Sequence, residues 1–435
     1  MNVTYVTMAF PYPSETFATN EVRALIAQGA SVTIEGLRRP HPRCRDMLRD
    51  RGLAGVRVTH NGVIASARGA IAALARPRLL LDTIRWVLST SKSRPRDLLG
   101  SLGLLPRAFD ILARLERSTP DVLHMYWSHY PTLVGRLVQR RLPRVVTSVS
   151  FIAYDLARAY GGTPSVARQA DVIRTVAAVN RAPVASLTGV DRERIEVVHD
   201  GVDVAWIDSL EEGVTRTPRS VVAVGRLVPG KGMDDVLRMF ARLHAHWPDA
   251  RLTILGEGPE RRALELLAAS LGLAAVVEFR GHVPHADVVR TLWRSEVAVL
   301  LSRSERLPNV VKEGMACGCV CVTTPTEGID ELVVHGVTGY LVPMADPVAA
   351  CDVIDDVFAG RGDGTMAARA ASFVREAFAL ERSVQRSMEL WRAAFARRRR
   401  GGSDAVGGDR AAVDPAGRDR GAATGTLPSA ITHPQ

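Results

Sequence analysis

Apolar and polar positions follow two different patterns along the first part of the chain, short apolar runs and helical spacing. Residues 3–10 (VTYVTMAF) and 31–37 (SVTIEGL) are short apolar runs typical of buried strands. Between them, residues 18–29 (ATNEVRALIAQG) have apolar side chains at helical spacing and end at a glycine, as helices commonly do. Strand, helix and strand in this order predict a βαβ unit with parallel strands. Helical patterns then fill residues 61–118, ahead of further strands.

A second alternating series occupies the later part of the chain. Strands that alternate with helices predict a parallel sheet covered on both faces, and ligands bind beyond the carboxyl ends of such strands. Two domains of this kind that face each other would leave a cleft between them. The predicted strands and helices of the second series are, in order, 220–227 (SVVAVGRL), 233–247 (MDDVLRMFARLHAHW), 250–259 (ARLTILGEGP), 261–273 (RRALELLAASLGL), 276–283 (VVEFRGHV) and 296–302 (EVAVLLS).

Length and composition agree with two α/β domains of ordinary size. The 435 residues are 46% hydrophobic, which is enough for two full cores. No stretch approaches about 18 uncharged apolar residues, so we expect no membrane-spanning helix. The first residues lack the basic and apolar regions of a secretory signal, and we therefore expect a cytoplasmic protein.

Five cysteines are present, and Cys317, Cys319 and Cys321 lie close together. This odd number does not resemble a disulfide framework and favours a reducing compartment. Alternation along a strand would place the three side chains on one face, and the apolar run CVCV predicts that this strand is buried. No histidine accompanies them, so we interpret them as buried structural side chains and expect no metal site.

The net charge of +10 is unevenly distributed. Residues 61–118 contain ten Lys or Arg against four Asp or Glu, interleaved with Ile, Leu and Trp86. Segments such as AIAALARPRLLLDTIRWVL have the pattern of basic amphipathic helices, which can lie on an anionic membrane face. A solvated helix surface explains the same charge, and both interpretations stay open. We expect no nucleic acid partner, because no stacking platform or known motif accompanies the charge.

The most informative stretch, SRSERLPNVVKEGMACGCVCV, holds the glutamates Glu305 and Glu313 on either side of Pro308. Proline favours the first position of a helix, which predicts a helix over about 308–315 with Glu305 in the preceding loop. Free amides near Asn309 and Val310 would then form an anion site. Carboxylates beside such a site suit a ligand with hydroxyls and phosphates, such as a nucleotide sugar.

A glycosidase would use two carboxylates as acid and base instead. That chemistry needs carboxyl groups roughly 5 to 9.5 Å apart. Eight helical steps would span about 12 Å, although the loop before Pro308 leaves the distance between Glu305 and Glu313 open. The spacing disfavours the hydrolase interpretation without removing it.

Arg226 and Lys231 lie just past the strand SVVAVG, in the segment GRLVPGKG. Gly225 and Gly230 permit tight turns and close approach by a ligand. A guanidinium and an ammonium at the carboxyl end of a sheet favour a pyrophosphate site. The chain lacks the phosphate-binding GxxxxGK[ST] motif, a GxGxxG after its first strand, and any Asp-x-Asp pair that would hold a metal on a diphosphate. These two cations would have to replace that metal.

The segments GRLVPGKG, GEGP, SERLPNVVKEGMACG and EGIDELVVHGVTGYLVP, in this order, resemble the C-terminal domain of retaining glycosyltransferases of family 4. VVHDGVD resembles the interdomain segment of that family, and FPYPSETFATNEVRALIAQG resembles its members that build bacterial exopolysaccharides of the colanic-acid type. The resemblance covers about residues 1–395. It implies an α/β GT-B architecture, in which two facing Rossmann-like domains with parallel sheets enclose an interdomain cleft.

The resemblance also implies a division of the chain. An N-terminal acceptor-side domain would span residues 1–203, and a C-terminal domain that binds the nucleotide sugar would span residues 204–373. A helix over 374–398 would cross back to the N-terminal domain. Residues 399–435 contain few large apolar side chains and are expected to be a disordered tail.

Roles for individual residues follow from the same resemblance. Arg226 and Lys231 would hold the diphosphate and Glu305 would contact the sugar hydroxyls, and these three are the expected catalytic residues. Glu313 would bind the ribose. The remaining expected residues on the donor side are Gly225, Val283, Leu307, Pro308, Asn309 and Val310, and those expected on the acceptor side are Ser14, Glu15, Thr16, Tyr154 and Asp155.

The chain departs from the family pattern at four positions. Ile152 and Ala153 replace a usual His-Gly pair ahead of Tyr154 and Asp155. Arg306 and Glu327 each stand where glycine is usual. These changes place bulk and charge near the donor sugar and remove a polar contact. His124 and His129 would lie near the cleft, where we expect both to be packed structural side chains.

These observations lead to one expected function and two alternatives. We expect a metal-independent retaining hexosyltransferase without a cofactor, which transfers a sugar from a nucleotide-sugar donor to a saccharide or lipid-linked acceptor. It would be cytoplasmic and peripheral on the inner face of the plasma membrane. Ile152 and Ala153 motivate an alternative, a nucleotide-binding protein that has lost transfer and acts as an assembly partner. Another GT-B chemistry, such as phosphorolysis or epimerisation, also remains open.

Overall fold

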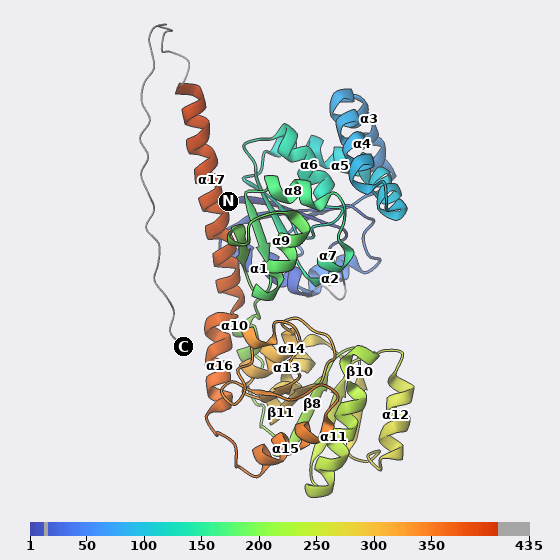
Figure 1. The fold of residues 1–435 in the computed structure, drawn as a ribbon, viewed down its shortest axis with the longest axis vertical. Coiled ribbons are helices and arrows are strands. Elements are labelled where there is room, and N and C mark those ends of the chain that lie inside the picture. The colour runs from blue at the N-terminus through green and yellow to red at the C-terminus, as the bar shows by residue number, and fades with distance from the viewer. Residues whose placement is uncertain (13–15, 408–435) are drawn as a thin grey trace, which may run out of the picture.

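A computed structural model describes residues 1–12 and 16–407 and contains two α/β domains stacked end to end (Figure 1). The N-terminal domain is built on a seven-stranded parallel sheet with the strand order β3-β2-β1-β4-β5-β6-β7. Its strands are β1 (Asn2–Thr7), β2 (Ser31–Gly36), β3 (Arg57–Thr59), β4 (Val122–Met125), β5 (Val146–Phe151), β6 (Val172–Thr175) and β7 (Ile195–Val197).

The C-terminal domain is built on a six-stranded parallel sheet with the order β10-β9-β8-β11-β12-β13. The predicted fold class, α/β with two parallel-sheet domains that face a cleft, is confirmed. The strands of this domain are β8 (Ser220–Val224), β9 (Arg251–Leu255), β10 (Val277–Gly281), β11 (Val297–Leu300), β12 (Val320–Thr323) and β13 (Tyr340–Leu341).

Helices cover both sheets, as parallel crossovers require. Those of the N-terminal domain are α1 (Thr16–Ala27), α2 (Cys44–Asp50), α3 (Val63–Leu74), α4 (Pro77–Ser91), α5 (Pro95–Ser118), α6 (Thr132–Arg141), α7 (Ala153–Arg158), α8 (Thr163–Gln169), η1 (Ala178–Asn180), α9 (Arg181–Thr188) and η2 (Arg192–Arg194). Those that follow are α10 (Val204–Asp208), η3 (Pro229–Lys231), α11 (Met233–His246), α12 (Arg261–Ser270), α13 (His285–Arg294), α14 (Asn309–Ala316), η4 (Ile329–Glu331), α15 (Pro347–Phe358), α16 (Met366–Ala377) and α17 (Leu380–Gly407).

Each sheet has a point at which the direction of strand order reverses. In the N-terminal sheet this point lies between β1 and β4, and in the C-terminal sheet it lies between β8 and β11. Loops that leave neighbouring strands there diverge and open a crevice beyond the carboxyl ends of the strands. The segments 225–232 and 301–308 are the loops after β8 and β11, and they contain six of the predicted donor-site residues, Gly225, Arg226, Lys231, Glu305, Leu307 and Pro308.

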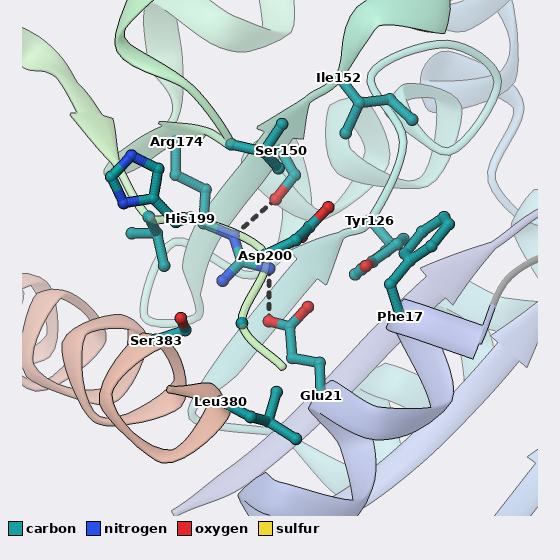
Figure 2. A pocket seen from close by; sticks show the side chains of 13 residues that line it. Phe17, Glu21, Tyr126, Ser150, Ile152, Arg174, His199, Asp200, Leu380 and Ser383 are labelled. Atoms are coloured by element: carbon teal, nitrogen blue, oxygen red, sulfur yellow. Dashed lines mark hydrogen bonds and ion pairs between the residues drawn. The ribbon is translucent and has the colours of Figure 1, made fainter. Parts of the chain in front are cut away.

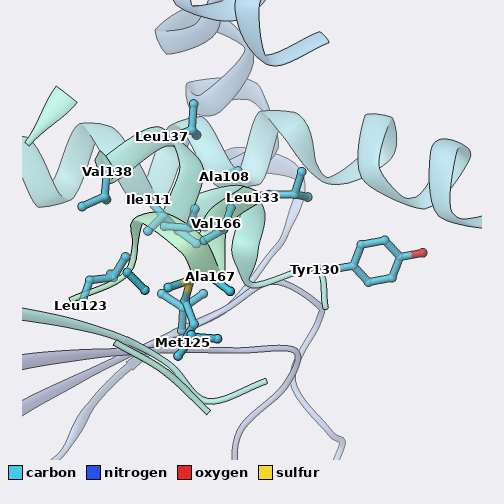
Figure 3. Packing of buried hydrophobic residues seen from close by; sticks show 14 of the residues in the cluster. Ala108, Ile111, Leu123, Met125, Tyr130, Leu133, Leu137, Val138, Val166 and Ala167 are labelled. Atoms are coloured by element: carbon cyan, nitrogen blue, oxygen red, sulfur yellow. The ribbon is translucent and has the colours of Figure 1, made fainter. Parts of the chain in front are cut away.

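The N-terminal core explains why its central strands are continuous apolar runs. Leu123 and Met125 of β4 are fully buried beneath α6 and belong to one hydrophobic cluster with Leu133 and Leu137 of that helix (Figure 3). A strand that is covered on both faces has no polar side. Burial of each large aliphatic side chain contributes about 1.5–3 kcal/mol to the stability of the fold.

The last helix returns to the N-terminal domain, where it packs along α1 and strand β5 (Figure 1). Trp391 is fully buried and its indole N–H donates to Ser148 Oγ at 2.9 Å. The helix expected over 374–398 therefore has different bounds, because α17 begins at Leu380 and ends at Gly407. Residues 399–407 of the expected tail are helical, and residues 408–435 lie outside the described part of the chain.

The cysteine prediction needs one correction. Cys317 is the C-cap of helix α14 and Cys319 precedes β12, so the three cysteines do not share one strand. All five cysteines are buried and free. Within residues 1–12 and 16–407, no three His, Cys, Asp or Glu side chains gather as a metal site would require. Among the described helices, none is long and apolar enough to cross a membrane.

Candidate functional site

The loops at the carboxyl ends of β8, β9 and β11 approach one another backbone to backbone. Gly256 has φ +144°, and a Cβ built on it would lie 1.8 Å from the carbonyl oxygen of Gly225. Gly232 has φ +62°, and a Cβ there would lie 2.0 Å from the carbonyl oxygen of Leu301. Only glycine fits at these two contacts. The glycines of GKG and GEGP therefore hold the loops of the site together.

Arg226 and Lys231 lie at this edge of the sheet, as predicted. Arg226 is exposed, and its side chain forms no ion pair or hydrogen bond with any residue in the described ranges. Lys231 forms an ion pair with Glu305. Burial, followed by the charge of Arg226, lowers the pKa of Lys231. The structure thus brings all three expected catalytic residues to one place.

Helix α14 begins at Asn309 and has Pro308 as its N-cap, within one residue of the predicted start. The amides of Asn309 and Val310 donate to no residue that the structure describes. Leu307 is buried and has φ +46°, a left-handed conformation that costs a non-glycine residue about 1 kcal/mol or more. The loop before α14 is therefore held in a strained shape that presents two free amides.

Glu313 lies in the second turn of α14 and is 9% exposed. Its Oε1 is 2.8 Å from Nε2 of His285, the first residue of α13. Burial works against the charged imidazole, but the hydrogen bond and charge of Glu313 raise the pKa of His285. Sequence reasoning missed His285. The signal was available, because His285 follows the half-buried Val283 in the same HVPH segment.

A hollow between the two domains joins this donor side to the start of α1. Thr16 therefore shares one hollow with Glu313, while Ser14 and Glu15 lie outside the described residues. The residues that line the hollow are Thr16, Phe17, Asn20, Gly201, Val202, Asp203, Trp206, Ile207, His285, Asn309 and Glu313.

The structure separates the two other expected acceptor residues. Tyr154 is 54% exposed. Asp155 is buried, and its carboxylate accepts hydrogen bonds from the amides of Ser128 and Ile152 and lies 3.0 Å from Nδ1 of His129. Because these partners occupy the carboxylate, Asp155 fastens the loop before α7 and does not point into the cleft. This corrects its expected role as an acceptor ligand.

A second interdomain hollow lies beyond the carboxyl ends of β5 and β6 (Figure 2). Arg174 forms an ion pair with Glu21 of α1 and donates to Ser150 Oγ at 2.6 Å. Ile152 lines this hollow at the position where the family resemblance places a histidine. Asp200 also lines it, and burial raises the pKa of its carboxyl group. Sequence reasoning missed Glu21, Arg174 and Asp200, which come from segments far apart in the chain.

The two histidines near the cleft are packed side chains, as expected. His124 is fully buried and contacts Ser148 at 2.9 Å, and burial lowers its pKa well below the ordinary value. His129 is 6% exposed beside Asp155. Both side chains are therefore held by neighbours inside the N-terminal domain.

Lys312 is a further residue that sequence reasoning missed. Its side chain is fully buried next to Glu313 in α14, and burial lowers its pKa to about 8. Nζ donates to the backbone oxygen of Asp200 at 2.6 Å and to Asn309 Oδ1 at 3.0 Å. Lys312 therefore ties the donor-side helix to the segment that connects the domains.

Comparison with known proteins finds a family match in the C-terminal domain. Residues 207–375 match the model of glycosyl transferases group 1. The chain is 30% identical over 193 residues to a glycogen synthase of Mycobacterium tuberculosis, covering 43% of this chain and 47% of that protein. It is 31% identical over 274 residues to a D-inositol 3-phosphate glycosyltransferase of a Mycobacterium species, covering 57% of this chain and 60% of that protein. The chain thus spans about half the length of these curated relatives.

Solved structures share the whole architecture. Anabaena HepE in complex with UDP superposes with a TM-score of 0.66 at 17% identity, covering 90% of this chain and 100% of that one. A glycosyltransferase from Rickettsia africae superposes with a TM-score of 0.64 at 14% identity, covering 90% of this chain and 98% of that one. At these identities the likeness shows the fold alone, which is the two-domain GT-B arrangement.

Proposed function

We propose that the protein is a retaining hexosyltransferase that moves a sugar from a nucleotide-sugar donor to a saccharide or lipid-linked acceptor, in cell-surface or exopolysaccharide biosynthesis. The observation that carries this proposal is the meeting of Arg226, Lys231, Glu305 and the free amides of α14 at one edge of the C-terminal sheet. The match of residues 207–375 to glycosyl transferases group 1 supports it.

The charges of the site suit a diphosphate. Arg226 has no partner among the described residues, and Lys231 is paired with Glu305. An entering diphosphate would attract Lys231 and free the Glu305 carboxylate to accept hydrogen bonds from sugar hydroxyls. Binding of the phosphates and recognition of the sugar are in this way coupled through one ion pair.

Transfer breaks the bond between the anomeric carbon and the phosphate oxygen and forms a bond from that carbon to the acceptor oxygen. Arg226 and Lys231 stabilise the negative charge that develops on the leaving phosphate. The acceptor hydroxyl proton passes to a leaving phosphate oxygen, and attack on the face that the phosphate leaves retains the configuration. Positioning by Glu305 and the amides of Asn309 and Val310 supplies the remaining contribution.

No resident metal or cofactor is part of this proposal. Metal ions in comparable reactions neutralise the diphosphate. Arg226 and Lys231 carry two positive charges at the place where that neutralisation is needed. Removal of divalent cations by a chelator should leave turnover unchanged.

We further propose that the protein is cytoplasmic and lies peripherally on the anionic inner face of the plasma membrane. Helices α3, α4 and α5 form the outer edge of the N-terminal domain (Figure 1). They expose large apolar side chains beside the exposed cations Arg68, Arg78, Arg85 and Lys92. The exposed apolar side chains on these helices are Val63, Ile64, Ile71, Leu74, Leu81, Leu88 and Leu99, of which Val63 is 77% exposed.

Sedimentation with anionic vesicles tests this membrane contact. Binding should be strong at low ionic strength and weaken as salt rises, because the cations act through a screened field. The double variant Ile64→Ser/Leu74→Ser should bind severalfold less. Leu266→Ser, at an exposed apolar position on α12, is the matched control and should bind as the parent protein does. Absence of binding at low salt would reject the proposal.

The alternative function is a nucleotide-binding protein without transfer. Ile152 favours it, because an apolar side chain lines the hollow where a histidine would contact the donor sugar. Turnover of a nucleotide sugar with an acceptor would support the transferase, whereas binding without turnover would support the alternative.

A thermal-shift screen against UDP, GDP, ADP, dTDP and NAD is the first test. A ligand specific for the folded state stabilises it by about 2.7 kcal/mol at a hundredfold excess over Kd. A shift with one nucleoside diphosphate would identify the base, and a labelled-donor assay would then identify the sugar. Absence of a shift with every diphosphate would contradict the donor site.

A further inference from the structure

Two of the departures from the family pattern meet each other in space. Arg306 lies in the loop between β11 and α14, and Glu327 lies in the loop between β12 and η4. Because β11 and β12 are neighbours, both loops leave the same edge of the sheet. Arg306 donates to Glu327 Oε2 through Nε at 2.9 Å and through Nη2 at 2.5 Å. The two charged replacements of glycine therefore compensate one another.

The third guanidinium nitrogen of Arg306 crosses to the other domain. Nη1 donates to Oδ1 of Asn180 at 2.8 Å. Asn180 is fully buried and ends η1, which follows β6 of the N-terminal sheet. The fork of one arginine thus joins a loop of the C-terminal domain to the N-terminal domain. A lysine, with a single ammonium group, could not hold both partners in this planar geometry.

The same turn of the N-terminal domain has a second anchor from the C-terminal domain. Glu331 accepts hydrogen bonds from the amides of Ala178 at 2.9 Å and Val179 at 3.1 Å, and lies 2.9 Å from His199 Nε2. A Cβ built on Gly328 would lie 2.9 Å from Val179 Cγ1. The two domains are therefore in close contact at η1, and the bond between Arg306 and Asn180 is part of this contact.

Arg306 is also the neighbour of Glu305 in the chain. Glu305 is fixed by its ion pair with Lys231, and Leu307 on the other side has the left-handed φ of +46°. A strained loop keeps its shape only where contacts on both sides determine it. Lys231 holds this loop at Glu305, and Glu327 holds it at the following residue, Arg306.

We propose that Arg306 is a positioning residue, which with Glu327 holds the Glu305 loop in shape and, through Asn180, keeps the two domains closed over the donor site. The role of the Glu305 loop in transfer rests on the proposed function, whereas the closure itself does not. Separation of the domains by a few ångströms must break the bond to Asn180, since hydrogen bonds are lost beyond about 3.5 Å. The bridge therefore exists only in the closed arrangement.

Spin-label distances between the domains test the closure without any enzyme assay. The five native cysteines are buried, so introduced cysteines at exposed Ala67 on α3 and Ser270 on α12 can be labelled selectively. Arg306→Ala should lengthen and broaden the distance distribution. The control is Arg369→Ala, which removes an arginine that pairs with Asp363 inside the C-terminal domain. An unchanged distribution in Arg306→Ala would overturn the proposal.

Kinetics test the effect on Glu305. Arg306→Ala should lower kcat about three- to tenfold, while the Kd for the nucleoside diphosphate stays within about twofold, because Arg226 and Lys231 are untouched. An equal loss in Kd and kcat would show that Arg306 only supports donor binding. If no nucleotide sugar is turned over by the parent protein, the proposed function fails, and the distance measurement still decides the bridge.

A double-mutant cycle of Arg306→Gly, Glu327→Gly and the double variant separates compensation from independent effects. Glu327→Gly alone leaves the Arg306 guanidinium without its carboxylate and next to Glu305, where it would compete with Lys231. The double variant Arg306→Gly/Glu327→Gly removes this competitor and restores both usual glycines. It should be at least about threefold more active than Glu327→Gly alone. Additive losses would contradict the compensation between the two residues.

Discussion

The two sides of the interdomain cleft differ in how their polar groups are used. On the donor side, Arg226 has no partner among the described residues and the amides of Asn309 and Val310 are free of partners within the same ranges. On the opposite side, Arg174 and Glu21 are buried and bind each other. Both sides lie beyond the carboxyl ends of parallel strands. One therefore presents unsatisfied groups to a ligand, whereas the other has satisfied its charges internally.

This difference separates residues that serve binding from residues that serve the fold. An exposed cation without a partner costs little in the folded state and gains most when an anion arrives. A buried pair has already lost its hydration and depends on its partner, so loss of one member leaves an uncompensated charge. Substitutions on the two sides should consequently change different measurements.

The largest expected effect is on stability and concerns Arg174. Its guanidinium binds Glu21, Ser150 and Ser387, and its side chain is 7% exposed. Arg174→Met should lower the free energy of unfolding by about 3–5 kcal/mol, because Glu21 would remain as a buried unpaired charge. Denaturant unfolding measures this loss in the free energy of unfolding. The double variant Glu21→Gln/Arg174→Met should recover part of the loss, and equal losses in both variants would show that the pair does not carry the effect.

Arg226 should give the opposite result, with lost activity and unchanged stability. Arg226→Ala should reduce kcat about 10²–10³-fold, the range typical for removal of one preorganised group that stabilises developing charge. Its midpoint of thermal unfolding should match that of the parent protein, since the side chain is exposed and has no partner among the described residues. Arg262→Ala, at an exposed arginine of α12, is the matched control. Normal turnover by Arg226→Ala would remove the diphosphate assignment.

The same contrast explains what could be predicted from the sequence. The donor side is built from short contiguous segments, so Pro308 predicted the start of α14 within one residue and GRLVPGKG located Arg226 and Lys231. The two-domain α/β fold followed from alternating strands and helices. These features depend on neighbours in the chain, which local patterns record.

The opposite side depends on residues that are distant in the chain. Glu21 and Arg174 are 153 positions apart and meet only because the fold brings their side chains, from α1 and β6, into the same hollow. Asp155 follows a pattern that indicated acceptor binding, but the loop after β4 supplies the partners that bury it. Arg306 and Glu327 likewise looked like separate disturbances of the donor site until the fold paired them. Local sequence patterns therefore could not predict which distant side chains pair with one another in the folded protein.

Lys312 lies between the two sides of the cleft, because it belongs to the donor-side helix α14 and donates to Asp200 of the opposite side. It gives the last prediction. Burial lowers its pKa to about 8, whereas an unfolded lysine has a pKa of about 10.4. Well below this folded-state pKa both states hold the proton, and the folded state bears the full cost of the buried charge. Between the two pKa values the unfolded state binds more protons, so this group makes stability rise with pH. The difference between the two pKa values corresponds to about 3 kcal/mol of unfolding free energy. Almost none of this gain is present at neutral pH, because Lys312 is then protonated in both states.

The five buried thiols act in the opposite direction over the same range. Burial raises the pKa of Cys319 to about 12, and an unfolded thiol ionises first as pH rises, which destabilises the fold. The parent protein alone therefore cannot isolate Lys312. The difference in unfolding free energy between the parent and Lys312→Met cancels the thiols, and it should move in favour of the parent by up to about 3 kcal/mol between about pH 8 and pH 10.5. A difference in unfolding free energy that stays constant with pH would mean that Lys312 keeps an ordinary pKa. Its ammonium group would then be hydrated in the folded protein, like the exposed cations of the donor side.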